Sequence, residues 1–509
     1  MGGADGGRSR RTRARGARAG RLARTVRPLL RLLGDTLRER IVAEAREVLL
    51  RLGVEVHDPA ALALLADHGA EVDPGARRAR LPGALVEKAL GTAPRGFALY
   101  DVPGERAHEL AGDSVGFAPG SAATRLLDGG ALRPPVTADY VRYARLVSSL
   151  PNLYAQSTAF VPSDVPATVS DSYRLFLGLL HCEKPVVTGS FSAEGFATML
   201  EMLLAVRGSA TALRERPFAV FTCCPTAPLS WSEEAARVLV LAARSGVPVE
   251  IVPVPMAGFV SPVTLVGTLV QGTAEALLGV VLHQLAAPGA PLLWGTSAAV
   301  FDVRSETAPT GAIETSMLTC GMNEVGKSLG LPTQGYATVS DAKELDAQAG
   351  LESAAGALLA ALSGVNSVSG PGLLDLDDGF SLEKLVLDDE LCGMALRLVR
   401  GVEPRDDFPA LPILSELLAE KHLLIASHTR RNLRKEISFP GPVLDRNREE
   451  RWRADGAATL AARASAEVAR RVGAWKPGRL ADAARRDLVL LMEAAARRAG
   501  ADRLPERGP

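Results

Sequence analysis

The sequence predicts an α/β protein built on a (β/α)8 barrel of the TIM type, with an N-terminal helical cap and a C-terminal helical extension. Eight short apolar or β-branched runs alternate with helical segments of about a dozen residues or more between residues 115 and 368. Continuous apolar runs are typical of parallel strands buried on both faces. Eight such strands are the number that closes this barrel. The chain also contains no glycine-rich dinucleotide fingerprint, which an open doubly wound sheet often carries.

The N-terminal regions precede the barrel. Residues 1–27 contain nine arginines and one acidic residue, Asp5, so we expect residues 1–35 to form a disordered tail. Residues 36–113 show helical periodicity and are expected to form the cap. Its helices are predicted at 36–52, 59–68 and 82–90, with Gly53, Gly69 and Pro94 as breakers.

The barrel is expected over residues 114–380. Four of its strands have proline at their first or second position, which a strand tolerates near its start. An open sheet stays an alternative if two of the runs are buried helix segments. The eight predicted strands are 115–118, 153–160, 185–188, 218–222, 248–252, 291–294, 331–336 and 366–368.

Residues 381–509 are expected to wrap the barrel as a helical extension. A long amphipathic helix is predicted at 382–399, followed by a connector rich in Pro and Asp at 403–412. Shorter helices are predicted at 413–418 and 459–472, with a basic stretch at 428–435 between them.

The charge balance excludes several classes of partner. Lysine plus arginine and aspartate plus glutamate both total 58, so no net field attracts nucleic acid or an anionic membrane. The sequence contains no run of eighteen apolar residues, which a membrane-spanning helix would need. The Arg10-Arg11 pair lacks the apolar stretch of an export signal. We therefore expect a cytoplasmic protein.

The cysteines and histidines predict neither a disulfide framework nor a metal site. The five cysteines are odd in number and are expected to be reduced. Adjacent Cys223 and Cys224 point to opposite faces of a strand and cannot chelate one metal. No His-x-x-x-His or Cys/His cluster is present, so we expect no metal bound by the protein.

The loop after the seventh strand is the richest in polar groups. Barrel enzymes place their functional side chains on the loops after the strands. Asp341, Lys343 and Gln348 are therefore candidate catalytic residues, and Ser340 is a candidate substrate contact. The alternative is structural: Ser340 or Asp341 caps the following helix, and Lys343 pairs with a surface carboxylate.

Aromatic residues gather at the strand ends and predict a binding site for a quaternary ammonium ion. Ring faces can replace the lost hydration of such a cation. Packing in the barrel core is the alternative for each ring. His428, in the basic stretch, is a further candidate contact, although a lone histidine is more often structural. The candidate rings are Phe117, Phe160, Phe191, Trp294 and Tyr336.

Several colinear motifs resemble the trimethylamine methyltransferase family. The match runs in order from about residue 36 to about residue 450. Each piece is weak, and their order over most of the chain is what carries the resemblance. The motifs include Gly53-Val-Glu-Val, Phe160-Val-Pro-Ser-Asp164, Lys184-Pro-Val-Val187, Ser340-Asp-Ala-Lys343, Asp346-Ala-Gln-Ala-Gly350 and Asp388-Asp-Glu390.

The resemblance implies a barrel that binds a methylated amine and presents its methyl group to the Co(I) of a separate corrinoid protein. Archaeal members use pyrrolysine, which this sequence does not contain. Members without it are similar to demethylases of quaternary amines such as glycine betaine. Two other functions stay open: a non-catalytic barrel that binds quaternary amines, and a different barrel enzyme that uses Asp341 and Lys343 as acid and base. The oligomeric state is open, with a homo-oligomer among the options.

Overall fold

The computed structural model describes residues 26–405, 407–501 and 503–505. Most of the arginine-rich tail lies outside these residues. Residues 26–34 are an extended segment that lies against the body of the protein, with Leu30 N donating to Leu362 O at 2.9 Å and Leu32 N to the Glu324 carboxylate at 2.6 Å. This last part of the expected disordered tail is therefore bound.

Each of the eight predicted runs contains a parallel strand or overlaps one. The strands form a five-stranded sheet of order β15-β13-β11-β10-β9 and a three-stranded sheet of order β17-β18-β6. Single parallel bridges join their edges, Phe117 to Leu153 and Trp294 to Thr333. The fold is thus a mixed α/β arrangement resembling a TIM barrel. The strands are β6 (Gly116–Ala118), β9 (Gln156–Ser157), β10 (Val186–Thr188), β11 (Ala219–Cys223), β13 (Val249–Ile251), β15 (Leu292–Trp294), β17 (Gln334–Tyr336) and β18 (Ser367–Ser369).

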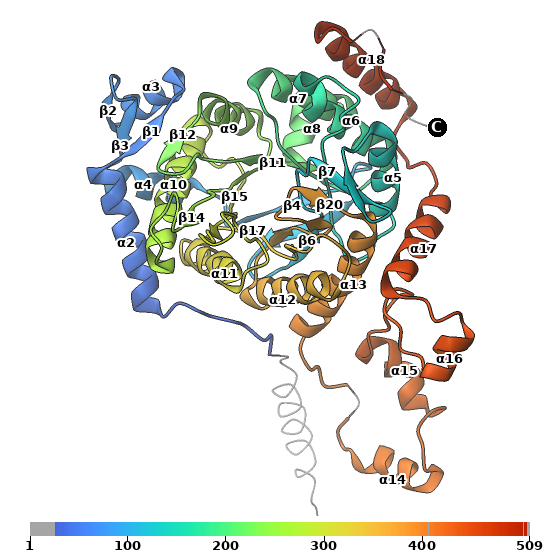
Figure 1. Ribbon diagram of the computed structural model, residues 1–509. Coiled ribbons are helices and arrows are strands. Elements are labelled where there is room, and N and C mark those ends of the chain that lie inside the picture. The colour runs from blue at the N-terminus through green and yellow to red at the C-terminus, as the bar shows by residue number, and fades with distance from the viewer. Residues whose placement is uncertain (1–25, 406, 502, 506–509) are drawn as a thin grey trace, which may run out of the picture.

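A ring of helices surrounds these strands (Figure 1). Serine, threonine or aspartate side chains cap the N-termini of five of them. One of these, α10, is long and apolar enough to cross a membrane, and 78% of its most apolar window is buried inside the protein. The helices are α5 (Thr137–Val147), α6 (Ser170–His181), α7 (Ala193–Arg207), α9 (Glu233–Ser245), α10 (Leu265–Ala286), α11 (Ile313–Ser328), α12 (Ala347–Ser363) and α13 (Leu382–Val399).

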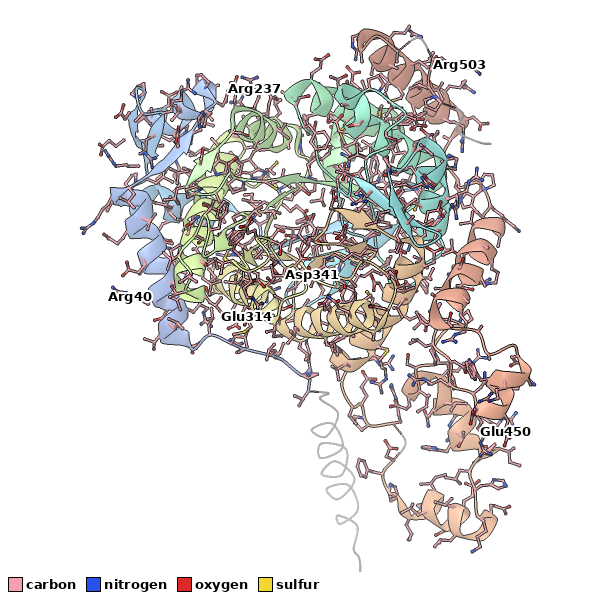
Figure 2. The ribbon with its side chains drawn as sticks, in the orientation of Figure 1. Arg40, Arg237, Glu314, Asp341, Glu450 and Arg503 are labelled. Atoms are coloured by element: carbon pink, nitrogen blue, oxygen red, sulfur yellow. The ribbon has the colours of Figure 1, made fainter. Side chains whose placement is uncertain are left out.

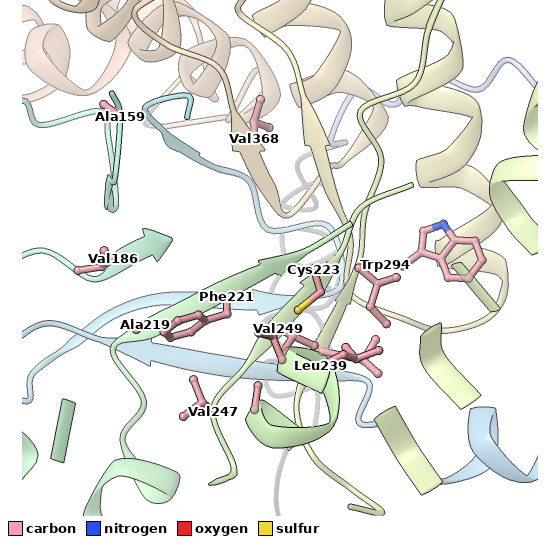
Figure 3. Packing of buried hydrophobic residues seen from close by; sticks show 14 of the residues in the cluster. Ala159, Val186, Ala219, Phe221, Cys223, Leu239, Val247, Val249, Trp294 and Val368 are labelled. Carbon is pink, nitrogen blue, oxygen red and sulfur yellow. The ribbon is translucent and has the colours of Figure 1, made fainter. Parts of the chain in front are cut away.

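The main hydrophobic core lies between the strands and this ring. Figure 3 shows Phe221 and Trp294 among its buried side chains. A smaller cluster lies on the other face of the strands, where Leu99 and Leu110 contact Val220 and Leu293. Leu99 and Leu110 come from the hairpin of β4 (Gly96–Tyr100) and β5 (Arg106–Ala111). Because Tyr100 N bonds to Pro217 O, just before β11, the hairpin covers the N-terminal ends of the strands.

The N-terminal segment packs on the ring through α2 (Asp35–Arg51), α3 (Pro59–Asp67) and α4 (Gly83–Thr92). Three short strands, β1 (Val54–Val56), β2 (Glu71–Asp73) and β3 (Arg78–Arg80), form a sheet with β12 (Ser230–Trp231). All three helices expected here are present.

The C-terminal segment has two parts. Helix α17 (Leu460–Gly473) packs on α5 and α13, and α18 (Asp482–Arg498) packs on α6 and α7. Helices α14 (Leu411–Glu420), α15 (Ser427–Glu436) and α16 (Glu449–Ala454) lie outside the ring (Figure 1).

Candidate active site

A cavity of about 350 Å³ lies at the C-terminal ends of the strands. Five strands contribute to its wall: Ser121 follows β6, Thr158 follows β9, Phe191 follows β10, Cys224 follows β11, and Tyr336 ends β17. This is the end at which barrel enzymes carry their active sites. The cavity is therefore the candidate active site.

A buried carboxyl group, Glu250, stands next to this cavity. It is fully buried on β13, and its Oε1 accepts a 2.6 Å hydrogen bond from Oγ1 of Thr222, a residue of the cavity wall. Its Oε2 has no hydrogen-bond partner. Burial raises the pKa of Glu250 to about 7. Among the described residues no Lys, Arg or His pairs with it, so the site can accept a cation.

Other polar side chains share the face of the strands on which Glu250 lies. Tyr154 and Ser367 hydrogen-bond to each other at 2.9 Å, whereas Gln334 Nε2 and Ser369 Oγ lack partners. Barrel interiors are normally filled with branched aliphatic side chains. A buried polar atom without a partner costs roughly 1–3 kcal/mol. Several such atoms around one carboxyl group indicate a place for water or a ligand.

A buried arginine lies on the wall of the cavity. Arg174 of α6 is 1% exposed, and its Nε and Nη1 donate to the carbonyls of Ser170 and Thr158 at 3.1 and 2.8 Å. Its guanidinium carbon lies 5.2 Å from the centre of the Phe191 ring. Within the described part of the chain the charge of Asp171 acts on Arg174 from a distance, no carboxylate forms a direct ion pair with it, and its Nη2 donates to no protein atom. Burial lowers its pKa. Nη2 is thus a free donor beside the cavity.

Tyr336 connects the cavity to a second carboxyl group, that of Asp377. Its hydroxyl donates to Ser121 O at 3.1 Å, and burial together with Glu250 raises its pKa. Asp377, whose charge also acts on Tyr336, is half-buried, with a pKa raised to about 7 by desolvation and an Oδ1 without a hydrogen-bond partner. The run 375–377 has φ values of 51°, 60° and 70°, unusual for residues with side chains. Such strain is common at functional loops.

The structure brings two of the five predicted aromatic rings to the cavity, Phe191 and Tyr336. Phe117, Phe160 and Trp294 are fully buried in the main core instead. Phe160 packs edge-on against Tyr140 and Tyr143, and Trp294 Nε1 donates to Met322 O at 3.0 Å. We therefore do not propose these three rings as substrate contacts.

The predicted polar residues of the seventh loop gather around Glu352 of α12. Ser340 Oγ, Asp341 N and Gln348 Nε2 all donate to its carboxylate, at 2.6, 2.8 and 2.9 Å. The helix is capped by Asp346, which accepts from Ala349 N at 3.1 Å, and not by Ser340 or Asp341. None of these residues lines the cavity.

Asp341, which lies inside the ring of helices in Figure 2, joins two loops. Its Oδ1 accepts from Thr310 N, Thr310 Oγ1 and Gly311 N at 2.8, 3.1 and 3.1 Å. Burial raises its pKa. Lys343 is 60% exposed and lies 3.4 Å from Asp375. Asp341 thus supports the loops, whereas Lys343 is a surface ion pair.

His428 lies on α15, outside the ring of helices. Its Nε2 is 3.8 Å from the Asp407 carboxylate. The structure therefore does not bring it to the cavity. In the described part of the chain, no three His, Cys, Asp or Glu side chains are grouped to hold a metal ion.

The family profile described as trimethylamine methyltransferase (MTTB) matches residues 2–500. The chain belongs to the trimethylamine methyltransferase family. This confirms the resemblance found in the motifs. As a member of that family, the protein is a methyltransferase.

Three curated relatives illustrate the breadth of the trimethylamine methyltransferase family. Trimethylamine methyltransferase MttB of Desulfitobacterium hafniense is 30% identical over 424 residues, covering 83% of this chain and 85% of that protein. MttB of Methanosarcina thermophila is 31% identical over 431 residues, covering 83% and 88%. The glycine betaine methyltransferase of D. hafniense is 28% identical over 428 residues, covering 84% and 89%.

Solved structures support the fold of this family member. The monomethylamine methyltransferase MtmB of Methanosarcina barkeri has a TM-score of 0.50 and 11% identity, covering 92% of this chain and 88% of its own. MtmB in complex with hydroxylamine gives the same TM-score at 12% identity. At this identity the likeness concerns the fold alone.

Sequence reasoning missed the groups with the strongest electrostatic features, Glu250 and Arg174. A signal for Glu250 was present, because it is the one charged residue in the apolar run 248–252. Arg174 gave no comparable signal, since a helix can expose or bury an arginine. Glu352 gave no signal either, because a helix can expose or bury a glutamate.

Proposed function

We propose that the protein transfers a methyl group from a quaternary amine that also carries a carboxylate, such as a betaine, to the Co(I) of a separate corrinoid protein. The observation that carries this proposal is the pairing of unlike groups at one cavity. Arg174 has a free donor on the cavity wall, and Glu250 is a buried carboxyl group behind Thr222. A zwitterion matches both groups, because its carboxylate can bind Arg174 and its cationic nitrogen can face Glu250.

The two charged groups favour a zwitterion over a simple amine. Trimethylamine has no anionic group for Arg174, whose burial is offset only in part by the charge of Asp171, without a direct ion pair, and is therefore costly. A bound carboxylate would accept the free Nη2–H as a charge-assisted hydrogen bond. The cationic nitrogen would then point toward Glu250 and the Tyr336 ring.

The chemistry follows from the charge on nitrogen. The corrinoid of the partner protein supplies the nucleophile that accepts the methyl group. As the C–N bond breaks, its electron pair stays on nitrogen, so the amine leaves neutral and no proton is needed. Binding energy from Arg174 is remote from the reacting methyl and is retained in the transition state. The attraction of Glu250 weakens as nitrogen loses its charge, which favours product release.

The loop residues have a supporting role in this proposal. Asp341 holds Thr310 and Gly311, and Asp377 hydrogen-bonds to Thr310 while the charge of Asp341 repels it. Together they fix the loops beside Tyr336. Ser340 acts through Glu352 on the same loops, whereas Gln348 makes an exposed hydrogen bond to Glu352.

We also infer that the two sheets close into one eight-stranded barrel. The bridges Phe117–Leu153 and Trp294–Thr333 support closure, as do the hydrogen bonds from Tyr154 N to Phe117 O and from Trp294 N to Pro332 O. A closed barrel leaves its mouth as the one route for the corrinoid protein.

A comparison of matched amines tests the proposal. Enzyme and a reduced corrinoid protein are incubated with glycine betaine, tetramethylammonium or trimethylamine, and methyl-cobalt is followed by its absorbance. We expect the fastest transfer from glycine betaine. Binding of betaine without transfer to any reduced corrinoid protein would favour the non-catalytic binding module. Faster transfer from trimethylamine would contradict the role given to Arg174.

A further inference from the structure

A second cavity, of about 590 Å³, lies between helices α6, α7 and α18. Its wall is formed by the short helix η1 (Ala167–Val169), the start of α6, the first turns of α7 and the end of α18. Helix α18 packs on both α6 and α7, as Figure 1 shows. We call this space the outer cavity and the candidate active site the inner cavity. The methyl transfer proposed above has no use for the outer cavity.

Phe191, in the loop between β10 and α7, lies on the wall of both cavities. Ser190 before it lines the inner cavity, and Ser192 after it lines the outer cavity. The loop therefore divides the space, with the Phe191 ring at the boundary. Phe191 is 59% exposed, whereas phenylalanine is usually among the most buried residues. The ring thus serves the boundary between the cavities and not the hydrophobic core.

The loop and the ring are both held in place. The buried Asp171 accepts hydrogen bonds at Oδ2 from Ser190 Oγ at 2.8 Å and from Phe191 N at 3.1 Å. A Cβ at Gly195 would clash with this carboxylate oxygen, so the glycine lets α7 begin close to Asp171. The guanidinium carbon of Arg174 lies 5.2 Å from the ring centre. Phe191 is therefore a fixed wall.

We propose that Phe191 determines which quaternary amines the enzyme accepts, because its ring closes the inner cavity at the end where Arg174 binds the carboxylate. This inference rests on the proposed function, since it takes a zwitterionic amine as the substrate. The guanidinium that would bind the carboxylate packs against the ring, so a carboxylate on Arg174 Nη2 lies beside Phe191. The ring and the guanidinium together fix the distance from the carboxylate end to the reacting methyl group.

A substrate with a longer chain between nitrogen and carboxylate does not match this distance. Either its chain presses on the Phe191 ring, or its methyl group moves out of line with the corrinoid. One methylene group more or less in a pocket changes kcat/KM by about 10- to 200-fold. Phe191 therefore favours betaines with a short chain.

Removal of the ring should connect the two cavities. Arg174 would stay in position, because the carbonyls of Ser170 and Thr158 still accept its hydrogen bonds. A longer chain would then extend past Arg174 into the outer cavity. Arg498, on the wall of that cavity, offers a second cation to a carboxylate that extends so far.

The experiment compares glycine betaine with its homologue that has two more methylene groups between nitrogen and carboxylate. Methyl transfer to reduced corrinoid protein gives kcat/KM for each, and calorimetry gives each dissociation constant. We expect the wild type to prefer glycine betaine. Phe191→Ala should raise the ratio of the longer to the shorter compound at least about tenfold. Phe259→Ala is the matched control, because Phe259 is a 67% exposed phenylalanine in the loop after β13, outside both cavity walls. It should leave the ratio unchanged.

A second substitution tests whether the outer cavity provides the added room. Thr198 lies on its wall, so the double variant Phe191→Ala, Thr198→Phe should lose most of the gain for the longer compound. If this variant does not fold, as judged by circular dichroism, Ala495→Met fills the same cavity from α18 in place of Thr198→Phe.

Three results would overturn the proposal: an unchanged ratio in Phe191→Ala, an equal gain in Phe259→Ala, or a gain that survives when the outer cavity is filled. These results leave the proposed function intact if the wild type transfers methyl groups from glycine betaine. Absence of transfer would contradict the proposed function instead, and the ratio of the two dissociation constants would still decide the role of Phe191. A wild type that binds neither compound would overturn both.

Discussion

Replacement of Glu250 by glutamine tests the electrostatic character of the site. Burial raises the pKa of Glu250 from 4.5 to about 7. At about 1.4 kcal/mol per pKa unit this corresponds to about 3 kcal/mol. Between pH 4.5 and 7 the folded protein holds a proton that the unfolded chain has lost, so stability falls as pH rises through this window and stays lower above it. Glutamine does not ionise and can still accept the Thr222 hydrogen bond.

We therefore expect Glu250→Gln to match the wild type at pH 4.5 and to be more stable by up to about 3 kcal/mol at pH 8. The assay is chemical denaturation of both proteins at the two pH values. Asp377, with a pKa also near 7, titrates in both and cancels in the difference. Tetramethylammonium should stabilise the wild type more at pH 8 than at pH 6 and should have little effect on the variant. An equal stability difference at pH 4.5 and pH 8 would refute the assignment.

Three further predictions address the other parts of the site. Arg174→Met should raise the KM for glycine betaine about 10- to 150-fold, because a charged hydrogen bond contributes about 1.5–3 kcal/mol, and should leave tetramethylammonium binding nearly unchanged in calorimetry. Asp341→Ala should lower both methyl transfer and thermal stability, whereas Lys343→Ala and Gln348→Ala, at exposed positions, should stay within about 0.5 kcal/mol of wild type with near-normal turnover. Deletion of residues 2–25 should change neither turnover nor melting temperature, and a large loss of either would assign the tail a role.

The strands could be predicted because their signal is local. Most of the eight runs are apolar or β-branched at successive positions, which is typical of a parallel strand buried on both faces, whereas 331–336 and 366–368 also carry polar residues. The residue that caps α12 was harder to predict, because Ser340, Asp341 and Asp346 all carry side chains that can cap a helix. The path of the loop decides which of the three caps the helix. Asp346 does so, whereas the Asp341 carboxylate accepts a hydrogen bond from Thr310 N.

The aromatic residues show why the site was predicted less well than the fold. Successive side chains of a strand point to opposite faces. Phe117 and Trp294 point toward the helices, whereas Glu250 and Tyr336 point to the other face. A shift of one residue in strand register reverses this assignment. Phe191 lies beyond a strand end, where the loop sets its direction.

A single-turnover reaction tests the central claim most directly. Enzyme, stoichiometric Co(I) corrinoid protein and glycine betaine with labelled methyl groups are mixed without any other methyl donor. We predict one labelled methyl-cobalt and one dimethylglycine per betaine consumed, with the rate reduced in Arg174→Met. Consumption of betaine without methyl-cobalt, or methyl-cobalt formation that is equally fast in Arg174→Met at low betaine concentration, would contradict the account.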